Sequence, residues 1–252
     1  EQEIFKDEPL TIVFSDKGWI RAIRGWEVDT ATLTFKTGDV FKASCKVHKY
    51  DLLYFFDTAG RVYSLSAHLL PSGRGHGEPL NLYLKVGEGA KICHMIAGDP
   101  NHWVMLASTD GYGFCCKFQD LTVKNKSGKA CLNIPNEATI LPPVVLGKEL
   151  ADWHVVCVSR LGNLLLFPAT QIAQLARGKG TKLIALNASA KSIKNELLML
   201  TAVAVSQSLI IQAGKRQYQL SHKDLARYTL SRGKRGAPLP RGLQGVTAIL
   251  IL

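Results

Sequence analysis

The stretch Ile12-Val-Phe-Ser-Asp-Lys-Gly18 decides the fold, because an apolar, β-branched run that ends in a glycine turn returns four more times. The other copies are Leu53-Tyr-Phe-Phe-Asp-Thr-Ala-Gly60, Val104-Met-Leu-Ala-Ser-Thr-Asp-Gly111, Val156-Cys-Val-Ser-Arg-Leu-Gly162 and Leu209-Ile-Ile-Gln-Ala-Gly214. Successive turn glycines lie 42, 51, 51 and 52 residues apart. A fixed period of this size is typical of repeat architectures, so the sequence predicts five units of one kind.

Each copy predicts a β-hairpin, because glycine adopts the positive φ that a tight hairpin turn needs. A second, basic glycine motif follows in four of the units. These motifs are Gly73-Arg-Gly-His-Gly77, Lys126-Ser-Gly-Lys129, Arg177-Gly-Lys-Gly180 and Arg232-Gly-Lys-Arg-Gly236. With the further strand-like runs, each unit would hold four short strands, which is the composition of a propeller blade.

The sequence therefore predicts an all-β, propeller-like protein of five blades, with residues 1–252 as a single domain and turn glycines at 18, 60, 111, 162 and 214. Only 171–176 and 222–228 look briefly helical, and Pro142-Pro143 predicts a strand interruption or a strand edge. The alternative is a β-sandwich in which the glycine spacing is fortuitous. The chain lacks an initiating Met, so we expect a domain excised from a longer polypeptide.

The net charge of +11 is concentrated at one end of the chain. Residues 1–168 hold 18 Lys/Arg and 18 Asp/Glu, whereas residues 169–252 hold 13 Lys/Arg against Glu196 and Asp224. Such asymmetry points to a polyanion, either nucleic acid or an anionic membrane surface. No basic amphipathic helix supports the membrane alternative, and no apolar run is long enough to span a bilayer.

Several kinds of site have no motif in this sequence. Phosphate-loop, serine-hydrolase and zinc-protease signatures are absent. The cysteines, at 45, 93, 115, 116, 131 and 157, have no Cys-x-x-Cys pair, so we expect buried, reduced thiols of a cytoplasmic protein and neither a metal site nor a cofactor. Asp16, Asp57 and Asp110 recur before turn glycines, where Asp is more simply a turn residue than a catalytic carboxylate.

The basic glycine loops are the best candidates for a binding site, because Lys and Arg flanked by glycine bring side chains and backbone N–H groups close to phosphates. The predicted DNA-binding residues are Arg21, Arg24, Lys36, Lys42, Arg61, Arg74, Lys124, Lys126, Lys129, Arg177, Lys179, Lys182, Lys215, Arg216, Arg232, Lys234, Arg235 and Arg241. The excess charge predicts that the last two units bind most tightly.

The order of motifs resembles a known family. Thr11-Ile-Val-Phe-Ser-Asp-Lys-Gly-Trp-Ile-Arg21, Leu70-Pro-Ser-Gly-Arg-Gly-His-Gly-Glu-Pro-Leu80, Ala107-Ser-Thr-Asp-Gly-Tyr-Gly-Phe114 and Leu141-Pro-Pro-Val144 are similar to the C-terminal domain of the A subunit (ParC) of bacterial topoisomerase IV, a type IIA topoisomerase. The resemblance continues through the later glycine motifs and spans nearly the whole chain.

The resemblance implies a β-pinwheel whose blades exchange strands, possibly an open ring, with duplex DNA along its basic edge. It implies DNA bending that guides relaxation and decatenation during chromosome segregation, in a bacterial, nucleoid-associated enzyme. The partners would be the N-terminal cleavage domain and the B subunit of an A₂B₂ assembly, which would hold the catalytic residues, Mg²⁺ and ATP. The gyrase box Gln-Arg-Arg-Gly-Gly-Lys-Gly is not matched: residues 22–42 offer only Arg24-Gly25 and Lys36-Thr-Gly38.

Two other functions stay open. The basic face could meet an acidic protein, so that the propeller serves as a protein-interaction platform. An enzyme would gain support only if Asp16, Asp57 and Asp110 converged on one pocket.

Overall fold

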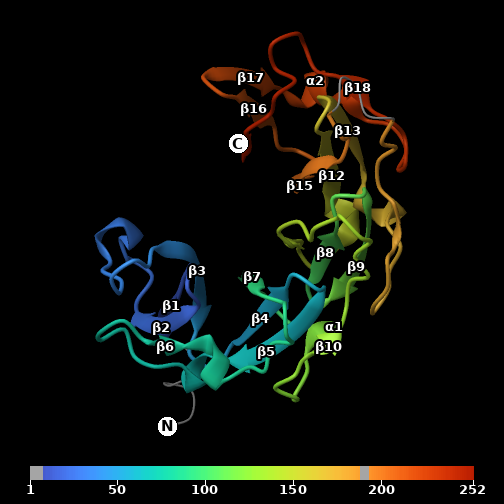
Figure 1. Cartoon of the computed structure of the whole chain (residues 1–252). Helices are drawn as coiled ribbons and strands as arrows, with labels where there is room; N and C mark the ends of the chain where they lie inside the picture. The colour runs from blue at the N-terminus through green and yellow to red at the C-terminus, as the bar shows by residue number, and fades with distance from the viewer. Residues whose placement is uncertain (1–7, 188–192) are drawn as a thin grey trace. The chain divides into compact units, whose positions relative to one another are not determined.

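The computed structural model describes residues 8–187 and 193–252. These residues form an all-β protein with short helical turns, as the repeat predicts. They divide into two compact units (Figure 1). Unit 1 contains the described residues up to Pro100 together with Phe118–Cys131, and unit 2 contains Asn101–Lys117 and Leu132–Leu252. Each unit is described by itself.

Unit 1 contains two antiparallel sheets of four strands. Sheet 1 has the order β3-β1-β2-β6, with β1 at Pro9–Ser15, β2 at Trp19–Arg24, β3 at Phe41–His48 and β6 at Glu78–Pro79. Sheet 2 has the order β10-β5-β4-β7, with β4 at Leu52–Asp57, β5 at Arg61–Ser66, β7 at Ile92–Ala97 and β10 at Lys129–Ala130. Strand β4 is buried on both faces, which explains its nearly continuous apolar sequence.

Unit 2 contains three antiparallel sheets. Sheet 3 has the order β11-β8-β9-β14, with β8 at Trp103–Ala107, β9 at Tyr112–Lys117, β11 at Val144–Val145 and β14 at Thr181–Lys182. Sheet 4 has the order β15-β12-β13-β18, with β12 at Trp153–Ser159, β13 at Asn163–Pro168, β15 at Leu197–Ala204 and β18 at Ala237–Pro238. Sheet 5 has the order β17-β16-β19, with β16 at Leu209–Ala213, β17 at Arg216–Leu220 and β19 at Ala248–Ile251.

The hydrophobic cores lie between neighbouring sheets of a unit. In unit 1, Ile12 and Phe14 of sheet 1 pack with Leu53 and Phe55 of sheet 2. In unit 2, one cluster joins sheets 3 and 4 and a second joins sheets 4 and 5. Because burial of apolar area stabilises the folded state, each sheet depends on its neighbour.

All five predicted hairpins are present, and each turn glycine has a positive φ. The values are +88° at Gly18, +84° at Gly60, +87° at Gly111, +89° at Gly162 and +59° at Gly214. The sequence-based prediction of the hairpin turns is therefore confirmed.

The fourth strand of sheets 1 to 4 is an exchanged strand, because it follows the next hairpin along the chain. Strand β6 follows the β4–β5 hairpin but pairs with β2, and β10, β14 and β18 repeat the pattern on β5, β9 and β13. The residue after each exchanged strand is a buried Leu or Cys whose N–H donates to the carbonyl of the preceding turn glycine. These bonds join Leu80 to Gly18 at 2.8 Å, Cys131 to Gly60 at 3.1 Å, Leu183 to Gly111 at 2.7 Å and Leu239 to Gly162 at 2.9 Å.

Sheet 5 has three strands within the described residues, and β17 is the edge strand on the side where sheets 1 to 4 have their exchanged strand. Gln217 and Gln219 of β17 are exposed, whereas no side chain of β5 or β13 is exposed. Polar side chains on the outer face are typical of the terminal unit of a repeat protein.

The helical turns were only partly predicted. The 222–228 prediction is confirmed by α2 (His222–Leu225) and the 3₁₀ turn Ala226–Tyr228, and a Ser221–Asp224 capping box begins α2. The 171–176 prediction is wrong beyond Gln171, where the 3₁₀ turn Ala169–Gln171 ends, because Ala173 and Leu175 form backbone hydrogen bonds with Cys115 of sheet 3. Helix α1 (Phe118–Leu121) was not predicted.

Across the described ranges, no helix is both long and apolar enough to cross a membrane.

All six cysteines are free thiols, and burial raises the pKa of Cys115 and Cys131 to about 12. Such thiols are poor nucleophiles at neutral pH.

Candidate nucleic-acid interface

Each basic glycine loop leads into an exchanged strand at the same edge of its sheet, and loops 2 and 3 as numbered here include residues of that strand. We number the loops by sheet: loop 1 is 73–77, loop 2 is 124–129, loop 3 is 177–182 and loop 4 is 232–236. Their last glycines, Gly77, Gly128, Gly180 and Gly236, have φ between +65° and +85°. A Cβ on any of them would lie no farther than 2.5 Å from a carbonyl oxygen of the neighbouring hairpin strand. These glycines therefore allow the exchanged strand to pack against its sheet.

Loop 1 carries one arginine, Arg74, and accepts a hydrogen bond from a second, Arg21 of strand β2. Arg74 is exposed. Arg21 is 4% exposed, and its guanidinium donates to Gly75 O and, at 2.8 Å, to Thr34 O. Burial lowers the pKa of Arg21 from its ordinary value. Because its donors are used inside unit 1, Arg21 does not fit the DNA-contacting role that the sequence predicts for it.

Loop 2 carries two exposed lysines, Lys124 and Lys126. Lys129 is turned inward: its Nζ donates to Asp120 O at 2.6 Å and Thr122 O at 3.2 Å, beside α1. Arg61 donates from Nη2 to Ser127 O at 2.8 Å and Gly128 O at 3.0 Å. Arg61 therefore binds the loop itself, and Lys129 ties the end of the loop to the carbonyls of Asp120 and Thr122.

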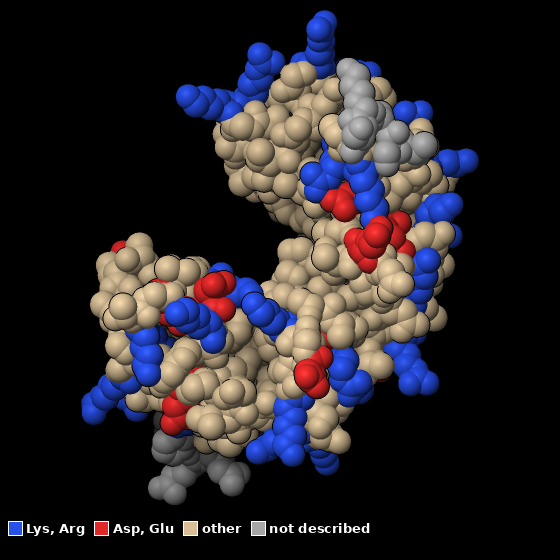
Figure 2. Space-filling view, in the orientation of Figure 1, with Lys and Arg blue, Asp and Glu red and all other residues tan. Residues whose placement is uncertain are grey.

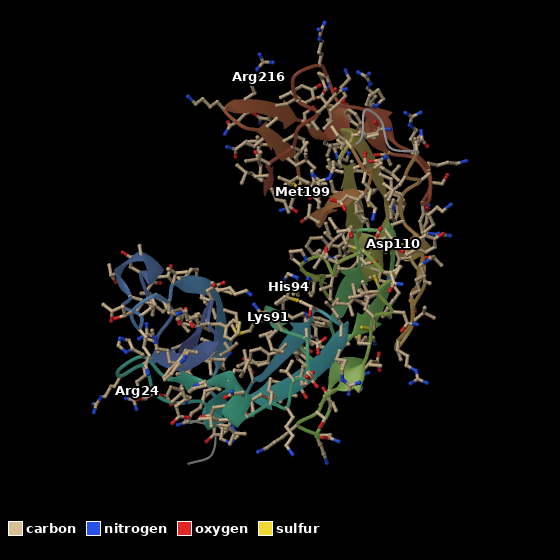
Figure 3. All side chains as sticks on the ribbon, viewed as in Figure 1. Arg24, Lys91, His94, Asp110, Met199 and Arg216 are labelled. Atoms are coloured by element: carbon tan, nitrogen blue, oxygen red, sulfur yellow. The ribbon has the colours of Figure 1, made fainter. Side chains whose placement is uncertain are left out.

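Loop 3 carries Arg177 and Lys182, both exposed. Lys179 lies 3.5 Å from Asp110 and 4.1 Å from the centre of the Tyr112 ring. Asp110 is labelled in Figure 3, on the side of unit 2 that carries this loop. The two contacts hold Lys179 close to the hairpin turn.

Loop 4 also combines held and exposed cations. Arg232 donates from Nη1 to Lys182 O at 2.7 Å, which ties loop 4 to loop 3. When the side-chain oxygen of Asn187 faces Arg235, it accepts a hydrogen bond from Arg235 Nε at 2.8 Å. Lys234 is exposed. Figure 2 shows Lys and Arg protruding along the right-hand edge of unit 2.

The remaining predicted residues lie outside the glycine loops. Arg24 forms an ion pair with Glu8 at 3.1 Å, Lys36 lies 3.7 Å from the Trp19 ring centre, and Lys42 Nζ lies 3.5 Å from Ile92 O. Lys215, Arg216 and Arg241 are exposed. Figure 3 shows Arg24 and Arg216 at the periphery of their units.

Some of the predicted cations are exposed and have no ion pair, side-chain hydrogen bond or aromatic ring contact within residues 8–187 and 193–252. This group, which we call the open cations, is Arg74, Lys124, Lys126, Arg177, Lys182, Lys215, Arg216, Lys234 and Arg241. The open cations are the predicted residues best able to bind an anion.

The sequence did not single out two further lysines. Lys17 and Lys91 line, with Lys42, a cavity of about 640 Å³ in unit 1 whose apolar wall includes Phe14 and Ile92. Lys17 lies in the first hairpin stretch, directly before Gly18, but was not selected as a binding residue, and Lys91 lies in no glycine motif. No signal in the sequence places them beside Lys42.

The carboxylates of the enzyme alternative act as turn residues or face solvent. Asp57 is fully buried, and it accepts hydrogen bonds from Ala59 N at 2.9 Å, Arg61 N at 3.0 Å and Tyr63 Oη at 2.7 Å. Burial, with help from Asp57, raises the pKa of Tyr63 to about 12, so the phenol stays a donor at neutral pH. Asp16 is exposed at the turn of sheet 1.

We expect Asp57→Ala to lower the free energy of unfolding by about 2 to 3 kcal/mol, because the turn loses two backbone hydrogen bonds and the buried Tyr63 hydroxyl loses its acceptor. Urea denaturation followed by circular dichroism measures the change. Asp16→Ala is the control and should shift stability by less than about 0.5 kcal/mol. Equal effects of the two substitutions would contradict the turn-anchor role of Asp57.

Comparison with known proteins identifies the family. The model of the DNA gyrase C-terminal domain, beta-propeller, matches residues 102–143 and 154–191. The A subunit of DNA topoisomerase 4 from Pseudomonas aeruginosa is 40% identical and that from Escherichia coli 37% identical, each over 252 residues. Those alignments cover 100% of this chain and 33% of each relative, so the chain spans about a third of their length.

Solved structures agree with this assignment. A DNA gyrase A C-terminal domain, 14% identical with a TM-score of 0.67, shares the fold. The E. coli ParC C-terminal domain matches with a TM-score of 0.86 and 37% identity, covering 98% of this chain and 99% of that one. The five-sheet fold, the strand exchange and this near-complete match together show that the chain belongs to the family of ParC C-terminal domains.

Proposed function

We propose that the chain binds duplex DNA without sequence preference, along the sheet edges that carry the basic glycine loops. The observation that carries the proposal is the repetition of one loop, with exposed Lys or Arg, at the same edge of sheets 1 to 4. Phosphate contacts from Lys, Arg and backbone N–H groups fix a protein on DNA but read no sequence. Repetition of such a loop suits a ligand whose charges also repeat.

The proposed binding includes a bend. Smooth bending of 20–30 bp by 40–90° costs about 1 to 6 kcal/mol. Six to ten phosphate contacts change affinity by roughly 10³ to 10⁵ between 50 and 200 mM salt, so the open cations can offset such a bend. Residues 22–42 support bending in place of a full gyrase-type wrap, because they lack the gyrase box and Arg24 is paired with Glu8.

Within a longer polypeptide, the chain would guide the choice of DNA for relaxation and decatenation. We propose that it carries no catalytic residue, and that DNA cleavage, Mg²⁺ and ATP hydrolysis belong to the N-terminal cleavage domain and the B subunit. The setting would be the bacterial cytoplasm, on the nucleoid. The family assignment supports this role.

A titration of the chain into a 30-bp duplex labelled at both ends tests the proposal. We expect energy transfer between the ends to rise, because the duplex bends, and log K to fall with log salt at a slope of about −0.9 per phosphate contact. A duplex of different base composition is the control and should bind equally. A slope near zero would contradict DNA binding, and absence of binding at low salt would favour an acidic protein partner.

A further inference from the structure

The carbonyl groups of residues 125–128, in loop 2, all accept hydrogen bonds from the protein. Asn125 O accepts from Gly128 N at 2.9 Å, and Lys126 O accepts from Lys85 N at 2.9 Å. Ser127 O and Gly128 O accept from the guanidinium of Arg61. The backbone from 125 to 128 therefore presents no unbonded carbonyl, while the side chains of Lys124 and Lys126 face solvent.

Arg61 is itself held in place. Its backbone N–H donates to the buried carboxylate of Asp57 at 3.0 Å, and its backbone pairs with Ala130 of the exchanged strand β10. The planar guanidinium donates from both Nε and Nη2 to Ser127 O and from Nη2 to Gly128 O, which uses the rigid fork of donors that an arginine has and a lysine lacks. Arg61 thus connects a fixed hairpin turn to a loop that bears two open cations.

A carbonyl oxygen is the negative end of the peptide dipole and would repel a phosphate. Because Arg61 takes two of the loop's carbonyls, loop 2 is ordered before any ligand arrives, and ordering before binding reduces the entropy lost on association. We propose that Arg61 is a positioning residue: it holds loop 2 so that Lys124 and Lys126 face phosphates, and it does not contact phosphate itself. This inference rests on the proposed DNA binding.

The same arrangement recurs at other glycine loops. Arg21 of β2 donates to Gly75 O of loop 1, and Asn163 of β13 donates from Nδ2 to Arg235 O of loop 4 at 3.4 Å. In each case a side chain on the second hairpin strand binds a carbonyl of the loop before the exchanged strand. The recurrence on sheets 1 and 4 indicates a common way of ordering these loops.

Arg61→Met removes both carbonyl contacts and keeps an unbranched side chain of similar length. We expect affinity for a 30-bp duplex at 0.1 M salt to fall about three- to tenfold, because Lys124 and Lys126 must then be ordered on binding. Arg160→Met is the matched control: Arg160 is also at a hairpin turn, but it bonds Glu196 and no glycine loop. The control removes the same charge and should change affinity less than twofold.

The decisive measurement repeats Arg61→Met in a Lys124→Ala/Lys126→Ala background. A positioning residue acts through those lysines, so we expect no further loss of affinity beyond that of the Arg160→Met control. A further loss, together with a fall of about 0.9 in the salt slope, would show that Arg61 contacts phosphate and would overturn the proposal. Unchanged affinity of Arg61→Met in the parent chain would show a merely structural role and would also overturn it.

A readout without DNA separates this inference from the proposed function. Trypsin cuts after exposed lysines in loops that open locally. We expect Arg61→Met to speed cleavage after Lys124 or Lys126 by about tenfold, which corresponds to a loss of about 1.4 kcal/mol in the local opening free energy. Unchanged cleavage would overturn the clamp even if the parent chain binds DNA. If Arg61→Met is cleaved faster but the parent chain does not bind DNA, then the proposed function has failed while Arg61 still orders loop 2.

Discussion

Gly180→Ala lowers the free energy of unfolding by about 3 to 5 kcal/mol, the largest stability effect that we expect from one methyl group in this chain. Gly180 has a φ of +85°, and a Cβ there would collide with the carbonyl of Gly113 in β9. The collision is with backbone, so no side-chain rotamer relieves it. Strand β14 must move away from sheet 3, which breaks the Leu183–Gly111 hydrogen bond.

Thermal and urea unfolding of Gly180→Ala and the parent chain measure this effect. Gly245→Ala is the matched control, because that glycine has no positive φ and no atom lies within 4 Å of the place that its Cβ would take. The control should leave stability unchanged or raise it by up to about 1 kcal/mol. A loss below about 1 kcal/mol for Gly180→Ala would contradict the requirement for glycine before the exchanged strand.

The second large effect concerns DNA affinity. Arg177→Ala, Lys182→Ala and Lys234→Ala together remove three open cations of loops 3 and 4. We expect the log K against log salt slope to fall by roughly 2.7, because each phosphate contact contributes about 0.9. Affinity at 0.1 M salt should drop roughly 30- to 500-fold, equally for duplexes of different sequence. Fluorescence anisotropy at four salt concentrations measures both quantities.

Lys46→Ala, Lys148→Ala and Lys223→Ala together provide the control, because these exposed lysines lie outside the glycine loops. Both triple variants lose the same charge, so long-range attraction falls equally in the two proteins. The control slope should stay within about 1 of the parent value. Equal slopes for the two variants would mean that unit 2 does not contact DNA through loops 3 and 4.

Sequence reasoning identified the hairpins because their signal is local. Gly60 and Gly162 end apolar runs, and a positive φ at a tight turn depends on only a few neighbouring residues. The strand exchange depends on pairing across the next hairpin, as between Ile20 and Glu78, which no local pattern encodes. The 171–176 segment went wrong for the same reason, since its hydrogen bonds are made with Cys115.

The candidate site was predicted in kind but not residue by residue. Arg74 and Arg177 are exposed as expected, whereas the side chains of Arg21 and Lys129 donate hydrogen bonds to backbone carbonyls. A sequence does not distinguish these two uses of a cation, because both place Lys or Arg near glycine. The last glycine of each loop was interpreted as an aid to phosphate approach, and the neighbouring carbonyl gives it a packing reason instead.

Because of the strand exchange, one sequence repeat does not correspond to one sheet: the fourth strand of a sheet belongs to the following repeat. A duplicated segment that begins at one hairpin would bring along the strand that completes the sheet before it, and would leave its own edge open. Growth by tandem duplication would thus close each earlier edge and move the unfinished one to the end. Among the described residues, β17 has such an open edge, and its exposed Gln217 and Gln219 suit a strand that faces water. The number of repeats can therefore change while every internal sheet keeps four strands.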